Sequence, residues 1–431
     1  MKLISVELTE PLPSIPPPTC GEQWVLLLLR GRPLGMLHTG PGGCTPRELA
    51  RVTLEQHGWA IARHVAAYSM SVGADAVRSP ISIDDLAKLS GASREETDAR
   101  AAITVAVCTR NRADQLPDCL HALLALDYPA ELLDILVVDN APADDSTRDV
   151  VDRYPRLRYI CEPRPGLDWA RNRAILESRA DIIAYTDDDV SVDRHWLRAV
   201  ESAFRQEPQA MCVTGLVVPD AIDTDAQALF ERYGGFGRGF ERGLFRVDVE
   251  GGHSAMRRFG GTGRFGTGAN MAFRREVFDE IGAFDPALDV GTPANGGGDL
   301  DMFFRVLRSG HALVYEPAAL VRHRHRRDYP ALKTQITNNG IGFYAYLVRT
   351  ARAYPDERRA VIALGVWWLW WWNARRLFAS FVRTGRIPRD LIVAELKGSF
   401  TGLRRYAAAR RRAADVLRQY GTPQPAGGAK P

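Results

Sequence analysis

Short apolar runs of strand length alternate with helical runs between residues 101 and 330, and this alternation limits the possible folds most strongly. The strand-like runs are ITVAVCT, DILVVDN, LRYICE, DIIAYTD and AMCVTGLVV, at residues 103–109, 134–140, 157–162, 181–187 and 210–218. Between the first two, the leucines of DQLPDCLHALLAL share one helical face. Strands joined by helices require right-handed crossovers, so the pattern predicts an α/β fold with a mostly parallel sheet covered on both faces.

Three consecutive aspartates, Asp187, Asp188 and Asp189, follow the fourth strand-like run. Successive side chains at a strand end alternate in direction, so Asp187 and Asp189 are expected on one side and Asp188 on the other. A bare acidic cluster next to a buried strand repels itself and needs a positive partner. A hard divalent cation held by carboxylate oxygens would be that partner. The alternative is a loop cap with solvated neighbours.

Two further polar signals end neighbouring strands, namely the TRNR run at 109–112 and Asp139. Each signal alone is typical of a cap or a turn. Together with the aspartates they converge on one edge of one sheet, because parallel strands end on the same side. Ligands of open α/β sheets bind at that carboxyl edge.

Composition excludes several classes of protein. The chain has 431 residues, 45% of them hydrophobic, which is enough for one large catalytic domain with appendages. A formal net charge of +4 gives no indication of nucleic-acid binding. The six cysteines are scattered without CxxC spacing, and the first 18 residues do not resemble a signal peptide. We therefore expect a cytosolic protein.

Residues 1–100 are expected to form a small α+β accessory region. Two short strands are predicted around residues 30–33, and a helix from Pro46 carries a capping box of Thr45 and Glu48. One or two short helices are expected between residues 79 and 100. No residue pattern in this region indicates chemistry.

Residues 331–431 are expected to be helical and rich in tryptophan and arginine. An apolar run from residue 360 to 372 is shorter than a membrane-spanning helix requires. Its five tryptophans favour a membrane interface, and the arginines that follow would lie near the phosphate headgroups. A buried core helix is the alternative. A disordered tail is expected after Tyr420.

Six motifs in order resemble glycosyltransferase family 2, the GT-A class of nucleotide-sugar transferases. They are VAVCTRNR, LLDILVVDNAP, GLDWARNRAILESRADIIAYTDDDVSVDRHWL, GTGANMAFRREVFDEIGAFDP, GGGDLDMFFRVLRSGH and VYEPAALVRHRHRR. The resemblance covers residues 101 to about 327, so residues 101–330 are expected to be the catalytic domain. It implies a GT-A fold and an inverting, metal-dependent transfer of a sugar from a nucleotide-diphosphate sugar to an acceptor hydroxyl.

The resemblance also assigns roles to residues. Asp189 is the expected ligand of Mn²⁺ or Mg²⁺, with Asp187 beside it on ribose or metal. A histidine after the last strand often completes the metal shell, which favours His323 over His325. The expected nucleotide-sugar-binding residues are Thr109, Arg110, Asp139, Arg171, Asp187 and Asp188.

Asp299 is the expected catalytic base, at the point where a glycine-rich loop meets a helix. The family usually shows Glu-Asp here, whereas this chain has Gly298 before Asp299. The aspartate is retained, but an acidic neighbour that often supports it is absent. A helix-capping role for Asp299 stays open.

Two other function classes are weighed against this reading. A nucleotidyltransferase that makes nucleotide sugars would open with a glycine-rich, lysine-bearing loop, and VCTRNRAD contains no glycine. A non-catalytic nucleotide-sugar-binding protein would need only the pocket. The acceptor is not readable from the sequence, although the tryptophans favour a lipid-linked one at the inner face of a membrane.

Overall fold

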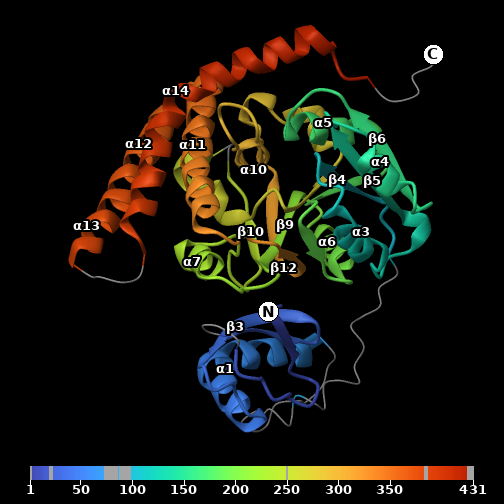
Figure 1. The fold of residues 1–431 in the computed structure, drawn as a ribbon, viewed down its shortest axis with the longest axis vertical. Helices are drawn as coiled ribbons and strands as arrows, with labels where there is room; N and C mark the ends of the chain where they lie inside the picture. Colours follow the sequence, from blue (N-terminus) through green and yellow to red (C-terminus); the bar gives the residue numbers. More distant parts are fainter. Residues whose placement is uncertain are drawn as a thin grey trace.

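A computed structural model describes residues 2–18, 23–71, 86, 99–248, 251–382 and 387–424 (Figure 1). A nine-stranded sheet, in the order β10-β12-β9-β11-β7-β4-β5-β6 with β8 paired to β12, forms its centre. The strands are β4 (Ile103–Thr109), β5 (Leu133–Asn140), β6 (Leu157–Glu162), β7 (Ile182–Asp187), β8 (Val190–Val192), β9 (Ala210–Pro219), β10 (Gly243–Phe245), β11 (Asn270–Arg274) and β12 (Ala312–His323).

Six of the nine strands run in the same direction, and the strand pairs divide into four parallel and four antiparallel. β4 pairs in parallel with both β5 and β7, and β5 pairs in parallel with β6. β11 lies antiparallel between β7 and β9, and β9 pairs in parallel with β12. Thr109 is in register with Asp139, and Cys108 with Asp187, so three of the predicted polar positions reach the same edge.

Helices cover both faces of this sheet because its strand residues are apolar on both sides. Val105 and Val107 of β4 face one core, with α3 (Leu116–Leu124) and α6 (Trp196–Gln206). Ala106 faces the other, with α5 (Leu167–Glu177) and α10 (Gly298–Arg308). Shorter helices complete the layers: α4 (Ser146–Val151), α7 (Asp225–Tyr233), α8 (Ala255–Phe259) and α9 (Val277–Ile281). The predicted α/β class is confirmed.

The N-terminal region is a three-stranded sheet with one long helix. Its elements are β1 (Ile4–Glu7), β2 (Gln23–Leu29), β3 (Arg32–Thr39) and α1 (Pro46–Ser71). The predicted capping box is present, since Glu48 accepts a hydrogen bond from the Thr45 N–H at 2.9 Å and its own N–H donates to the Thr45 hydroxyl. Trp24 and Leu26 pack against Leu320 of the large sheet. Apart from Leu86 and residues 99–100, the helices expected between 79 and 100 lie outside the described residues.

The C-terminal region is helical, as expected. It comprises α11 (Tyr329–Ala353), α12 (Arg358–Trp367), the π-helical segment η5 (Trp368–Ala374), α13 (Arg375–Val382) and α14 (Arg389–Tyr420). In Figure 1, α11 stands between the sheet and the pair of α12 and α14. Within the described ranges, no helix is long and apolar enough to cross a membrane. The tail beyond residue 424 lies outside those ranges, and the domain boundaries at residues 100 and 330 stay predictions.

Candidate active site

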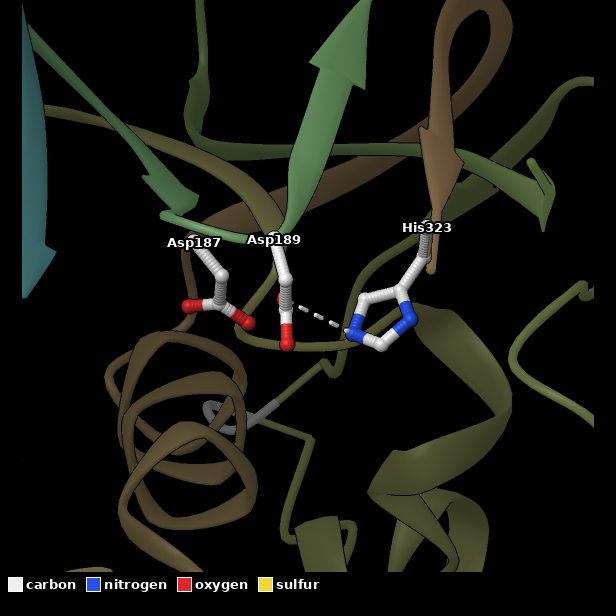
Figure 2. A group of neighbouring side chains, drawn as sticks. All are labelled: Asp187, Asp189 and His323. Atoms are coloured by element: carbon white, nitrogen blue, oxygen red, sulfur yellow. Dashed lines mark ion pairs between the residues drawn. The ribbon is translucent and has the colours of Figure 1, made fainter. Parts of the chain in front are cut away.

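A group of three potential metal ligands lies at the carboxyl edge of the sheet. Asp187 ends β7, Asp189 lies in the turn to β8, and His323 ends β12. The antiparallel pairing of β8 with β12 places Val190 opposite His323, which brings the turn and the histidine together. One ligand atom from each residue lies within 4.8 Å of the others. Figure 2 shows both carboxylates and the imidazole directed to the same space, with His323 Nε2 3.3 Å from Asp189 Oδ1.

The chemistry of this group fits a divalent cation. Asp189 Oδ1 is buried and receives no hydrogen bond from the described residues, so it keeps lone pairs for a metal. Burial, followed by repulsion from Asp189, raises the pKa of Asp187 to about 7. Burial lowers the pKa of His323 to about 4, so the imidazole is neutral, which is the form that binds metal. Two carboxylates and one imidazole suit Mn²⁺ or Mg²⁺.

Asp188 lies in the turn between β7 and β8 and is not a member of this group. Its carboxylate accepts hydrogen bonds from the Thr109 hydroxyl and from Arg112 Nη1, both at 2.7 Å. Arg112 Nη1 also lies 3.2 Å from Asp189 Oδ2. Arg112 is therefore a positive partner of the acidic cluster that the sequence prediction did not name. The only signal for it is its place in the TRNR run, three residues after Thr109.

A second layer of residues orients His323. Its Nδ1 lies 3.3 Å from His325 Nδ1, and His325 Nε2 lies 2.7 Å from Glu231 Oε1 on α7. If His325 Nε2–H donates to the carboxylate, His325 Nδ1 accepts the proton of His323 Nδ1–H. His323 Nε2 then keeps its lone pair toward Asp189. The structure thus places His323 in the metal group and His325 behind it, and Glu231 was not foreseen from the sequence.

Asp299 and Arg171 both lie next to Gly268. Asp299 lies in the first turn of α10, and its Oδ2 accepts a hydrogen bond from the Gly268 N–H at 2.9 Å. A Cβ added at Gly268 would lie 2.5 Å from Arg171 Nη2, so glycine permits this close approach. Arg171 Nη1 donates to Asp168 Oδ1 at 3.0 Å. Asp168, which the sequence prediction missed, is buried, and burial raises its pKa to about 7.

Residues predicted to bind the nucleotide lie at the ends of β4 and β5. Asp139 is fully buried, and its Oδ2 accepts a hydrogen bond from the Tyr159 hydroxyl at 2.9 Å. Burial raises the pKa of Asp139, although the hydrogen bond from Tyr159 acts to lower it. Arg110 is exposed directly after β4, and Asn111 Oδ1 accepts a hydrogen bond from the Ala143 N–H, which joins the loops after β4 and β5.

Comparison with known proteins identifies the domain that carries this site. Residues 104–282 match the family model described as glycosyl transferase family 2. These residues form a family 2 glycosyltransferase domain. The resemblance inferred from the motifs and the expected class of enzyme, a glycosyltransferase, are both confirmed.

The relatives of this domain are distant in sequence. The glucosyl-dolichyl phosphate glucuronosyltransferase of Haloferax volcanii is 24% identical over 52% of this chain and 69% of its own length. The pre-mycofactocin glycosyltransferase of Mycobacterium tuberculosis is 26% identical over 54% of this chain, but the alignment spans 45% of that protein. Among solved structures, a mannosyltransferase from Pyrobaculum calidifontis in complex with GDP-Man and Mn²⁺ has a TM-score of 0.44 at 19% identity, covering 75% of this chain and 88% of that one.

The family match and the structure contribute different parts of the site. Thr109, Asp139, Arg171 and the three aspartates lie inside the matched range of the family 2 glycosyltransferase domain. Asp299 and His323 lie beyond residue 282, and only the folding of α10 and β12 onto the sheet brings them to the same edge.

Proposed function

We propose that this protein is an inverting, metal-dependent glycosyltransferase that moves a sugar from a nucleotide-diphosphate sugar to an acceptor hydroxyl. The observation that carries the proposal is the convergence of Asp187, Asp189 and His323 into one group at the sheet edge where Asp139 also ends its strand. The match to family 2 supports a nucleotide-sugar donor, and the group of three metal-ligating side chains supports metal dependence.

In this proposal, different residues at the sheet edge bind different parts of the donor. Asp189 and His323, with Asp187 beside them, would hold Mn²⁺ or Mg²⁺. When bound, that cation would neutralise charge on the departing diphosphate. Asp139, Thr109 and Arg110 would shape the pocket for base and ribose. The guanidinium of Arg171 would donate paired hydrogen bonds to phosphate.

In this proposal, Asp188 contributes to donor binding by positioning Thr109 and Arg112. Its buried carboxylate fixes Thr109 and Arg112 at the rim of the nucleotide pocket, at 2.7 Å each. Because Arg112 also contacts Asp189, the donor pocket and the metal group are held as one unit.

Asp299 is the proposed base for a single displacement. The acceptor oxygen forms a bond to the anomeric carbon while the bond from that carbon to the diphosphate oxygen breaks. The diphosphate leaves with the bonding pair, and the acceptor proton passes to the Asp299 carboxylate. The Gly268 and Leu300 N–H groups, both 2.9 Å from this carboxylate, hold it in place without the usual acidic neighbour.

The acceptor is proposed to be lipid-linked and reached at the inner face of a membrane, with the protein peripheral to it and cytoplasmic. The name of the Haloferax volcanii relative, a dolichyl phosphate glucuronosyltransferase, supports an acceptor of this class. A glycan or natural-product hydroxyl is the alternative acceptor.

The test needs no known acceptor. Purified protein is incubated with Mn²⁺ or Mg²⁺ and a panel of nucleotide sugars, and slow hydrolysis of the donor is measured. We expect metal-dependent hydrolysis of at least one donor, reduced about 10²-fold or more in Asp299→Asn. Nucleotide-sugar binding without hydrolysis of any donor would favour a non-catalytic binding protein. Pyrophosphate-dependent release of a nucleoside triphosphate would favour a nucleotidyltransferase.

A further inference from the structure

The tryptophans between residues 367 and 372 divide between two environments. Trp368 packs inward, with its ring centroid 4.7 Å from that of Phe343 on α11, and Trp372 packs on Trp368 at 5.3 Å. Trp368 packs against the core that covers the sheet, and both rings are half-buried. The alternative of a buried core helix therefore applies to part of this segment only.

The other three tryptophans of this segment and two phenylalanines of α13 are exposed to solvent. We call them the aromatic surface: Trp367, Trp370, Trp371, Phe378 and Phe381, with exposed fractions of 48%, 74%, 49%, 73% and 61%. A helix that is half covered by protein normally turns polar side chains outward. A run of large exposed aromatic rings on consecutive helical turns indicates a surface that something else covers.

The part of the chain that carries the aromatic surface is rich in positive charge. Residues 358–412 contain thirteen arginines and lysines but two acidic residues, and one of these, Glu395, is buried. The Arg375 guanidinium lies 4.8 Å from the Trp371 ring, and that of Arg389 lies 4.2 Å from the Phe381 ring. On α14, which packs against η5 and α13, Arg404 and Arg405 are exposed.

We propose that the aromatic surface inserts into the interface of an anionic lipid bilayer. Tryptophan seeks the headgroup boundary, and neighbouring arginines contact lipid phosphates. A second copy of the chain fits less well, because a two-fold symmetric contact through this face would bring the same excess of arginines together from both copies.

The surface is joined to the proposed catalytic base by packed elements. A Cβ added at Gly260, which ends α8, would lie 2.6 Å from Leu364 of α12, and Glu357 accepts the Ala255 N–H at 2.9 Å. The loop after α8 leads to Gly268, whose N–H holds Asp299. The inference therefore rests on the proposed function: a bilayer on this surface would present a lipid-linked acceptor on the Asp299 side of the sheet edge.

The test is sedimentation of the full chain with vesicles of phosphatidylglycerol and phosphatidylcholine, compared with phosphatidylcholine alone. We expect binding to anionic vesicles that weakens with salt, because screening reduces the contribution of the arginines. The triple variant Trp367→Ala, Trp370→Ala, Trp371→Ala should lose at least about tenfold in partition coefficient. Arg404→Glu with Arg405→Glu should also lose at least about tenfold on anionic vesicles.

Trp59→Ala is the matched control, because Trp59 on α1 is 77% exposed outside the aromatic surface and should leave partitioning unchanged. Donor hydrolysis should persist in the triple variant, so failure of vesicle binding is distinguishable from failure of the proposed function. The inference is overturned if the intact chain stays in the supernatant at low salt. It is also overturned if sedimentation velocity shows a dimer that the triple variant loses.

Discussion

The aspartate triplet shows how neighbouring residues of one chemical type take different roles. Asp187 and Asp189 come together in the metal group, whereas Asp188 in the turn between β7 and β8 contacts Thr109 and Arg112. The contacts of Asp188 with Thr109 and Arg112 could not be predicted, because they depend on the path of the loop after β4. Periodicity in a sequence specifies the direction of a side chain but not its partner.

The layer behind His323 leads to a prediction about metal affinity. His325→Phe keeps the aromatic packing on Phe230, 4.8 Å away between ring centroids, but removes the acceptor for His323 Nδ1–H. Mn²⁺ affinity, measured by electron paramagnetic resonance in the presence of a nucleoside diphosphate, should fall about 10- to 100-fold. Glu231→Gln should give a smaller loss.

A surface pair of the same type provides the control. His311 Nε2 lies 2.6 Å from Glu280 Oε2, away from the metal group, so His311→Phe and Glu280→Gln should not change Mn²⁺ affinity. Wild-type affinity in His325→Phe would show that His323 needs no such orientation.

Asp168 leads to a prediction about pH. Its carboxyl ionises near pH 3.8 in the unfolded chain, whereas burial raises its pKa to about 7 in the folded protein. Between these values the unfolded chain binds fewer protons, so rising pH favours unfolding. The melting temperature of the metal-free wild type, relative to Asp168→Asn, should therefore fall as pH rises from about 4 to about 7. A difference that is constant over this range would contradict the assignment.

At the scale of elements, the sequence predicts the parallel strands well but does not predict how the antiparallel strands pair. The apolar runs of β4, β5 and β7 stand out because both faces of each strand are buried. The run GTGANMAFRR indicates a tight loop followed by a strand, which β11 confirms, but five residues do not predict its antiparallel pairing between β7 and β9. The site could be predicted where it lies at parallel strand ends, whereas Glu231 lies on a helix outside every motif, and Asp168 lies inside a motif but has no chemical signal of its own.

The crossing of α11 and α14 leads to a prediction about stability. A Cβ added at Gly398 of α14 would overlap the Thr337 carbonyl oxygen of α11, so Gly398→Ala should lower the free energy of unfolding by about 1–3 kcal/mol. Gly58→Ala is the control, because Gly58 lies in α1 with no atom within 4 Å of an added Cβ. It should be neutral or stabilise by about 0.5–1 kcal/mol. Equal urea midpoints for the two variants would contradict close packing of these helices.

At the scale of the whole molecule, one domain carries the chemistry and the two flanking regions dock on it. The N-terminal sheet packs through Trp24 and Leu26, and Arg322 of β12 donates to the Ser5 hydroxyl at 2.7 Å. α14 crosses the molecule, and the Gly421 carbonyl after it accepts from Arg164 Nε at 2.9 Å near the nucleotide edge (Figure 1). Composition predicts that these regions exist, but their docking depends on surface shape that a sequence does not display.

The central claim is that the carboxyl edge binds a nucleotide diphosphate through a divalent metal. Calorimetric titration of nucleoside diphosphates, UDP and GDP among them, with and without Mn²⁺, tests it in the wild type and in Asp189→Asn. Binding to the wild type should require Mn²⁺, and the variant should lose about a hundredfold or more because an amide replaces an anionic ligand. Circular dichroism should show an unchanged fold. Equal Mn²⁺-dependent affinity in the variant, or wild-type binding indifferent to Mn²⁺, would contradict the claim.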